Sequence, residues 1–525
     1  MSGSSDGRAG RVADEACSFG SASRNRVIAG AAEGLDALLL ASLARKSGGA
    51  GHLHIARDSR RAELLKSLLS IFAPGLNVIV LPGWDSPPYD RMSPSMARGG
   101  ARVAALQELA TRDQEQRLLL IVTASALVQR IPEPQFFLQA IESLALGAEC
   151  EADGLQLRLR YRGFSESALV QEQGEFSLRG LVLDFWPPSL QQPVRLEFAE
   201  GRIAGMRCFD PSTQQTTAEI DCIEFGRASE IPLDPSSIAR FKSNQQERLG
   251  GILPSTIEQA LDVPSKPFGL EPWLPLFHAR LLSVSEWLPR ATISFEEGAD
   301  ERIEDRLELV RESFETHRSL ASTENALRPL PPEALYIQMQ DWKALLVRRA
   351  TRITPDPSDK PTRKDAGGRS GPRFSGERDP LAAAAAHLAA EASSGRRIMF
   401  LAPTRNLLKR LLPALADLMD FKPIIVESWP ARTPKRKLVG AVAPLERGFT
   451  SPTLTIVTAA DILGLSQARP ARSSAVTVPL PDLLEIAPGD HVVHIEHGIG
   501  RVGAPETLDA AGASHAHRQR TLQRA

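Results

Sequence analysis

A short continuous apolar run, LLLIV at residues 118–122, is the feature that most limits what this chain can fold into. Such a run suits a strand covered on both faces, as strands inside parallel sheets are. Upstream, GHLHIA (51–56) and NVIVLP (77–82) flank an amphipathic segment that starts after Asp58, a residue type that caps helices. This alternation predicts a parallel sheet with helices on both faces, the hallmark of an α/β protein.

The pattern changes around Cys150. LQLRLRY (155–161), GLVLDFW (180–186) and VRLEFAEGRI (194–203) alternate with period two, which is typical of antiparallel strands. Helical spacing returns in ERIEDRLELVRESFETHRSL (301–320). We therefore expect a β-rich antiparallel domain at 131–215, inserted into an α/β domain formed by 25–130 and 216–350.

Pro, Gly, Ser and charged residues dominate 351–380, which predicts a flexible linker. Its basic residues suggest either contact with a phosphate backbone or, as composition favours, a solvated spacer. Beyond it, RRIMFLAP, TRNLLKRLLPALADLM and LTIVTAADILG alternate between strand and helix. They predict a second, smaller α/β domain over 381–475, so the chain is expected to be multi-domain.

The N-terminal segment 1–24 is rich in Gly, Ser and Ala without an apolar run, so it is expected to be a disordered tail and not a signal peptide. Elsewhere the longest apolar stretches are shorter than the ~20 residues of a membrane span. The four cysteines are widely separated, as in a reduced protein. These features predict a cytoplasmic location.

Charge is balanced over the whole chain, with 62 Lys and Arg against 63 Asp and Glu. The chain as a whole is therefore not drawn to nucleic acid or to an anionic membrane. His491, His494 and His497 suggest a metal, but in a strand His494 faces away from the other two. A polar sheet surface or hairpin is the favoured interpretation, and no metal is expected.

The segment AGAAEGLD, from Ala29 to Asp36, has the outline of a phosphate-binding loop, G-x-x-x-x-G-K-[ST]. Gly34 is kept, but Ala29 replaces the first glycine. Leu35 stands where a lysine would reach the phosphates, and Asp36 where a hydroxyl would bind magnesium. We interpret the segment as a relic or a plain loop, and we expect the chain to bind no nucleotide cofactor.

The segment PGWDSPPYDRMSP (82–94) has the Pro and Gly content of a loop. Trp84 and Tyr89 are aromatic residues that could anchor a partner or could pack the loop onto its own domain. The sequence leaves both interpretations open.

Five motifs in order then show a family resemblance. They are WDSPPYDRMSPS, IVTASALVQRIP, GEF-x-x-RG-x-x-x-DFWPP, PVRLEF and RCFDPSTQQT, and together they resemble the UvrB-homologous module of bacterial transcription-repair coupling factors. LERGFTSPTLTIVTAADILG and GDHVVHIEHGIGR resemble the family's third domain and the start of its RNA polymerase-interacting domain. The resemblance implies a degenerate RecA-like domain that carries a UvrA-binding insert.

By this resemblance, UvrA-binding residues map onto the insert, and an apolar residue of the polymerase-facing strand maps onto Leu508. An arginine suits such an interface because its planar fork of donors holds a carboxylate or carbonyls. The implied UvrA-binding residues are Arg179, Asp184, Phe185, Arg195 and Arg207.

The sequence departs from the family pattern in places. Glu166 stands near the position of a partner-binding arginine, which weakens the expectation for UvrA. Trp186 and Gln215 are milder departures. Only the first strands of a tudor-like β-barrel are expected over 476–525, so the polymerase-interacting domain is expected to be incomplete and polymerase binding impaired. A truncated or frameshifted product is expected.

The resemblance implies a role in transcription-coupled nucleotide excision repair. The chain is expected to be a binding scaffold that recruits UvrA to RNA polymerase stalled at a lesion, without catalysis of its own. The alternative is an ATP-dependent DNA translocase whose motor, with ATP, Mg and DNA as its ligands, lies beyond residue 525. A self-standing UvrB-like ATPase is disfavoured by Leu35 and Asp36.

Overall fold

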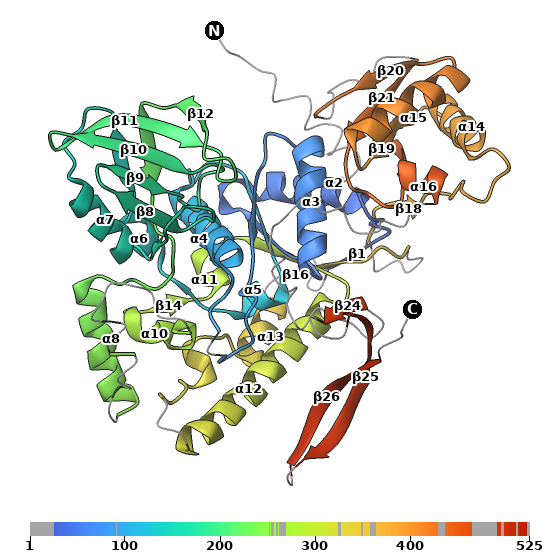
Figure 1. Cartoon of the computed structure of the whole chain (residues 1–525). Helices are drawn as coiled ribbons and strands as arrows, with labels where there is room; N and C mark the ends of the chain where they lie inside the picture. Colours follow the sequence, from blue (N-terminus) through green and yellow to red (C-terminus); the bar gives the residue numbers. More distant parts are fainter. Residues whose placement is uncertain are drawn as a thin grey trace.

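A computed structural model of the chain describes 26–464 and three strands within 491–521. Gaps occur at 91, 251–252, 254–256, 259–260, 262–268, 324–326, 348–349, 358–363 and 429–435. Figure 1 shows an α/β unit in the centre, a β-rich insert to one side and a smaller α/β unit to the other. None of the described helices is both long and apolar enough to cross a membrane.

The central unit is built on a seven-stranded sheet in which every pair of neighbours is parallel. The parallel sheet predicted from the sequence is therefore confirmed. In spatial order the strands are β17 (Lys364–Asp365), β1 (Arg26–Ala29), β16 (Ala350–Ile353), β15 (Thr292–Glu296), β2 (His52–Ile55), β4 (Leu118–Val122) and β3 (Asn77–Leu81).

Strand β4 shows why this sheet is covered on both sides. Leu118, Leu120 and Val122 belong to one apolar core, whereas Leu119 and Ile121 belong to another. Because side chains alternate along a strand, the two cores lie on opposite faces of the sheet. The continuous run LLLIV is thus fully buried, as its composition predicted.

The helices of this unit follow the predicted amphipathic segments. Asp58 caps one of them by accepting a hydrogen bond from the Arg61 N–H, whereas the Thr123 side chain makes no such bond at the helix that follows it. The helices are α2 (Leu35–Ser47), α3 (Ser59–Phe72), α4 (Met96–Thr111), α5 (Ala124–Val128), α6 (Pro134–Leu138), α8 (Pro235–Arg248), α10 (Leu274–Phe277), α11 (Val284–Trp287), α12 (Ala299–Thr323) and α13 (Met339–Val347). Short elements are η1 (Gly48–Ala50), η2 (Glu271–Trp273), η3 (Pro332–Ala334), and the paired β5 (Ile131–Pro132) and β14 (Leu281–Leu282).

The insert carries a six-stranded sheet that is antiparallel except for its first pair. A two-stranded ladder, β6 (Glu142–Ala145) with β13 (Cys222–Phe225), closes it where the chain enters and leaves. The sheet consists of β7 (Ser165–Glu166), β8 (Glu175–Arg179), β9 (Val182–Phe185), β10 (Val194–Ala199), β11 (Arg202–Phe209) and β12 (Thr216–Glu219).

One predicted strand of the insert is wrong. LQLRLRY lies in helix α7 (Ala152–Tyr161). Leu155 and Leu159 are four residues apart, so both reach the core from one helical face, while Leu157 is exposed. The sequence Leu-x-Leu-x-Leu fits a strand by alternation and a helix by its outer pair, and packing decides for the helix.

The smaller α/β unit has a six-stranded sheet with helices α14 (Pro380–Ser393), α15 (Arg405–Leu418) and α16 (Ala459–Leu463). Thr404 caps α15 by accepting from the Leu407 N–H. The strand order is β18 (Arg369–Ser370), β22 (Phe449–Thr450), β23 (Leu454–Thr458), β19 (Arg397–Ala402), β21 (Lys437–Val442) and β20 (Lys422–Ile425).

The linker predicted at 351–380 is not a free spacer. Its beginning belongs to β16, Lys364–Asp365 joins the central sheet as β17, and Arg369–Ser370 joins the second sheet as β18. Composition misled the prediction because these strands are held by backbone hydrogen bonds, which need no apolar side chains.

The two α/β units share one apolar core. Leu35, Leu39 and Leu40 of α2 belong to the same buried cluster as Met399 and Phe449 of the smaller unit. In Figure 1, α2 and α3 lie between the central sheet and the smaller unit. The two units are therefore packed face to face and are not tethered at a distance.

At the C-terminal end, β24 (His491–His494), β25 (Gly498–Ala510) and β26 (Ala513–Thr521) form an antiparallel three-stranded sheet. The segment rich in Ala, His and Arg near the end of the chain thus forms strand β26, although its sequence has no alternation of apolar residues that would predict a strand. The predicted tail 1–24, the end of the predicted small α/β domain (465–475) and the start of the predicted polymerase-interacting domain (476–490) lie outside the described residues.

Candidate partner-binding face and the degenerate phosphate loop

A row of polar side chains crosses the insert sheet. Strand pairing places Ser177, Asp184, Arg195, Arg207 and Glu219 opposite one another on successive strands. Residues paired in this way project from the same face of a sheet. Arg179, two positions along β8 from Ser177, projects from the same face, so four of the five predicted UvrA-binding residues come together there.

Asp184 is the centre of this face. Its side chain is fully buried, yet its Oδ1 accepts from Nε of Arg195 at 2.7 Å and its Oδ2 from Nη2 of Arg195 at 2.8 Å. Oδ2 also accepts from Nη2 of Arg179 at 2.7 Å. A buried carboxylate that receives three charge-assisted bonds fixes both guanidinium groups. Asp184 thus positions the arginines from beneath and does not itself present a contact surface.

The arginines differ in exposure. The side chain of Arg179 is 50% exposed and that of Arg195 is 21% exposed. The Arg195 guanidinium also lies over the ring of Phe209, 4.6 Å from its centroid. Arg207, which is 32% exposed, pairs with Glu197. Arg179 is therefore the most accessible of the three arginines on this face.

Phe185 faces the other way. It neighbours Asp184 along β9, so it projects from the opposite face, where it is fully buried against Phe164 and Phe225. The expectation that Phe185 itself contacts a partner needs correction, because this side chain holds the insert's core together.

Glu166 lies on the edge strand β7 and is held by neighbours in the insert. It pairs with Arg160 of α7 and accepts from Gln156 at 3.2 Å. Near the position where the family pattern has an arginine, this chain therefore has an exposed carboxylate that pairs with an arginine of the preceding helix.

The degenerate phosphate loop precedes α2. Gly34, with φ of 93°, is the N-cap residue, and Oδ1 of Asp36 accepts the N–H groups of Gly34 at 3.0 Å and Ala37 at 2.8 Å. Backbone N–H groups at such a helix start are the donors that hold phosphate in working loops. Here the chain's own carboxylate takes up two of them.

The cation at this site also comes from within the protein. Arg61 of α3 pairs with Asp36 and, at 2.8 Å, with Oε1 of Glu296 at the end of β15. Burial raises the pKa of Asp36 to about 6, although Arg61 opposes the rise. Burial also pushes the pKa of Glu296 upward, but His54 and Arg61 hold it at about 2. The charges of the loop are thus compensated internally, by a partner 25 positions away that sequence inspection missed.

The space over the loop is filled by the following segments of the chain. A Cβ on Gly34 would lie 2.9 Å from Cε1 of Phe449, and a Cβ on Gly368 would lie 2.4 Å from Cδ2 of Leu35. The N–H of Ala366 donates to the carbonyl of Ala29 at 2.7 Å, and that of Gly368 donates to the carbonyl of Gly30 at 2.9 Å. The loop is therefore packed as an internal joint.

Trp84 and Tyr89 pack onto their own domain. Trp84 is 7% and Tyr89 is 4% exposed. Nε1 of Trp84 donates to Oε2 of Glu230 at 3.0 Å, and the Tyr89 ring contacts Phe314 and Tyr336. Of the two interpretations left open by the sequence, the structure supports packing.

The remaining predicted residues lie in the C-terminal strands. Leu508 is opposite His515 in the β25–β26 pair. His491 and His494 belong to β24, whereas His497 lies outside the described residues. Among the residues that the structure describes, no three His, Cys, Asp or Glu side chains gather as metal ligands.

Comparison with known proteins matches this architecture. Residues 143–230, which contain the polar row, match the family described as UvrB interaction domain. The fold and this face thus define a chain that carries a UvrB-type interaction module on an α/β body.

Over almost its whole length the chain is homologous to the N-terminal portion of the transcription-repair coupling factors. It is 27% identical to that of Haemophilus influenzae over 93% of this chain and 43% of the relative. It is 28% identical to that of Escherichia coli over 91% of this chain and 42% of the relative. A 258-residue match to the Myxococcus xanthus factor is 31% identical and covers 46% of this chain and 21% of the relative. The chain spans less than half the length of these relatives.

Proposed function

We propose that this chain acts in transcription-coupled nucleotide excision repair as a binding scaffold, and that its insert docks the damage-sensor ATPase UvrA. One observation carries the proposal: buried Asp184 holds Arg179 and Arg195 in fixed orientation on the outer face of the insert sheet. The match of this segment to the UvrB interaction domain and the named relatives support the same role.

The physical argument concerns preorganisation. A free arginine loses side-chain entropy when a partner immobilises it, and this loss weakens binding. Arg179 is already held through Nη2, while half of its side chain is exposed. A guanidinium presented in this way is suited to a carboxylate or to backbone carbonyls of a partner. We therefore place Arg179 at the centre of the UvrA contact, with Arg195 and Arg207 beside it.

The test is a titration of purified UvrA against this chain. Arg179→Ala is expected to weaken binding by about 2 kcal/mol, or roughly thirtyfold in Kd, as for a central interface arginine. The matched control is Arg202→Ala, which removes an arginine of similar exposure, 55%, from the same insert but outside the row. Equal affinities for Arg179→Ala and the unmodified chain would contradict the proposal.

We further propose that residues 29–36 do not bind ATP and that this segment has become a joint between the two α/β units. A phosphate loop needs free N–H groups, a lysine and open space. Asp36 occupies two of the N–H groups, Leu35 stands in the lysine position, and Phe449 packs on Gly34.

The competing function is that of an ATP-dependent DNA translocase. A steady-state phosphate-release assay on the purified chain, with and without DNA, separates the two. We expect no turnover. Turnover that a substitution within 29–36 abolishes would establish the competing function for this part of the molecule.

RNA polymerase is the second proposed partner, through the strand that carries Leu508, and we expect its binding to this chain to be impaired. β24 pairs only with the first residues of β25, so Leu508 lies where β25 pairs with β26 alone among the described strands. An open strand edge of this kind is suited to pairing with a partner's strand. In a pull-down at physiological salt we expect the unmodified chain to retain no polymerase stably. Retention that Leu508→Lys abolishes would show that this strand suffices for the contact.

A further inference from the structure

The side chain of Gln214 connects three parts of the insert. Gln214 lies in the turn between β11 and β12, where it is partly buried. Its Oε1 accepts from Nη2 of Arg195 at 3.3 Å. Its Nε2 donates to the carbonyl of Val170 at 3.3 Å and to that of Pro211 at 2.9 Å. One amide group thus joins an arginine of the polar row to the loop between β7 and β8 and to its own turn.

The backbone of Gln214 is in the left-handed region, with φ of 60°. Glycine adopts this conformation without strain, whereas a residue with a Cβ is disfavoured there. Backbone bonds already close the turn, because the N–H of Gln214 donates to the carbonyl of Asp210 at 2.7 Å and the N–H of Asp210 donates to that of Gln215 at 2.9 Å. A glycine would suit this turn better, so the value of a glutamine here lies in what its side chain contacts.

Gln214 completes the hydrogen bonds of one side of the Arg195 guanidinium. Asp184 accepts from Nε and Nη2 of Arg195, and the ring centroid of Phe209 lies 4.6 Å from the guanidinium carbon. Nη2 carries two N–H groups, and both Asp184 and Gln214 accept from this nitrogen. Among the described residues no acceptor bonds to Nη1 of Arg195. Nη1 is therefore the nitrogen that remains for a partner.

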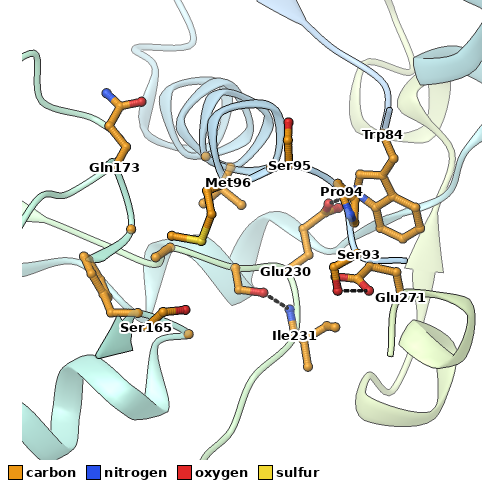
Figure 2. Close-up of a pocket in the computed structure, with 18 of the residues that line it drawn as sticks. Trp84, Ser93, Pro94, Ser95, Met96, Ser165, Gln173, Glu230, Ile231 and Glu271 are labelled. Atoms are coloured by element: carbon orange, nitrogen blue, oxygen red, sulfur yellow. Dashed lines mark hydrogen bonds between the residues drawn. The ribbon is translucent and has the colours of Figure 1, made fainter. Parts of the chain in front are cut away.

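The loop between β7 and β8, residues 167–174, is also fixed near its other end. Figure 2 shows Gln173 at the border of a cavity of about 410 Å³ between the insert and α4. Nε2 of Gln173 donates to the carbonyl of Leu190 at 2.9 Å. Together with the bond from Gln214 to Val170, this contact fixes the loop at two points.

We propose that Gln214 is a positioning residue of the partner-binding face and acts through Arg195. It holds the guanidinium so that Nη1 is the donor presented to a carboxylate or a backbone carbonyl of the partner. Holding the group in advance reduces the side-chain entropy that is lost on binding. The inference rests on the proposed UvrA contact and assigns to that contact a residue outside the sheet.

The test is a double-mutant cycle in the affinity of the full chain for UvrA, measured by titration. Gln214→Gly removes the side chain and leaves a residue that the turn accepts without strain. It is expected to raise the Kd about fivefold, as for the loss of one hydrogen bond to a charged group that keeps its other partners. In the Arg195→Ala background the same change is expected to raise the Kd less than about twofold, because the residue through which Gln214 acts is missing.

The matched control is Gln192→Gly, the same change at an exposed glutamine of the insert whose Oε1 accepts from Thr217. It is expected to leave the Kd unchanged in both backgrounds. Arg195→Ala keeps the buried Asp184 carboxylate paired with Arg179. If Arg195→Ala does not fold, Arg195→Lys, which keeps a cation beside Asp184, takes its place.

Amide hydrogen exchange separates positioning from unfolding of the turn. The N–H groups of Asp210 and of residue 214 close the turn, and their protection is expected to be the same in Gln214→Gly as in the unmodified chain. A loss of affinity accompanied by a loss of this protection would show that the turn has unfolded, and the proposal would be overturned.

The remaining outcomes distinguish this inference from the proposed function. An equal increase in Kd in both backgrounds, or no increase in either, would overturn the role of Gln214. If Arg195→Ala leaves the affinity unchanged while Arg179→Ala lowers it, the role of Gln214 fails and the UvrA contact stands. If neither arginine variant lowers the affinity, the UvrA contact itself is refuted, and the role of Gln214 with it.

Discussion

Gly34 lies directly against the ring of Phe449, so closely that a Cβ on this glycine would fall 2.9 Å from Cε1. The contact joins the start of α2 to the second sheet across the shared core.

Gly34→Ala is therefore expected to destabilise the chain by about 2 to 3 kcal/mol, through a left-handed backbone strain of roughly 1 kcal/mol plus overpacking against Phe449. Gly48→Ala is the control, because Gly48 also has positive φ, 57°, but open space around it. Denaturant unfolding measures both. Equal losses for the two variants would show that the contact with Phe449 contributes nothing.

Asp184→Ala is expected to lower the unfolding free energy by about 2 kcal/mol. It removes the partner of two arginines, but both can regain water because they are partly exposed, which keeps the loss below the full penalty of a buried pair. Amide hydrogen exchange in β9 and β10 reports the effect locally. Asp221→Ala, an exposed site of the same insert, controls for loss of one charge. Unchanged protection in Asp184→Ala would argue against the anchoring role.

His52 makes stability depend on pH. Burial, with a smaller contribution from His54, lowers the pKa of His52 from 6.5 to about 3. Between pH 6.5 and pH 3, His52 is therefore protonated in the unfolded state but not in the folded state. The free energy of unfolding consequently falls as the pH decreases below 6.5. At pH 5 the loss is about 2 kcal/mol.

The check is the unfolding free energy at pH 7.5 and 5.0 for the unmodified chain and for His52→Gln. Glutamine can still reach the hydroxyls of Thr292 and Ser294, which lie 2.6 Å and 2.7 Å from the imidazole nitrogens. Between pH 7.5 and 5.0 the unfolding free energy of the unmodified chain should fall by about 2 kcal/mol more than that of the variant. Other titrating groups, such as His278, contribute equally to both proteins and drop out of this comparison. An equal loss of unfolding free energy in the unmodified chain and in His52→Gln would contradict the role of His52.

Glu166→Arg is expected to increase affinity for UvrA severalfold, about 1 kcal/mol, because it removes an exposed negative charge from the insert and supplies a donor where relatives of this family are expected to have one. Glu172→Arg, an exposed substitution with the same change in net charge, is the control. A gain shared equally by both variants would attribute the effect to overall charge and remove Glu166 from the interface.

Much of the fold was readable from the sequence because its strongest signals are local. The run 118–122 predicted a strand covered on both faces, and Asp58 predicted the start of its helix. Helix α7 was missed because its sequence fits both a strand and a helix, and packing decides between them. The strands inside 351–380 were missed because they are short and are held by backbone pairing.

The candidate site was readable only in part. Alternation along β9 requires Asp184 and Phe185 to face opposite ways, so one of the two had to be a core residue even before the structure was known. The pairing of Asp36 with Arg61 could not be read in this way. It depends on how α2 and α3 pack, and a motif comparison shows only which phosphate-binding groups are missing, not which group replaces them.

The chain crosses from one sheet to the other within a few residues, as β17 edges the first sheet and β18 edges the second. In evolutionary terms, this junction is a poor place for recombination. A gene split there would expose α2 where the smaller unit now covers it. The two units are consequently expected to be inherited together, whatever is gained or lost on either side of them.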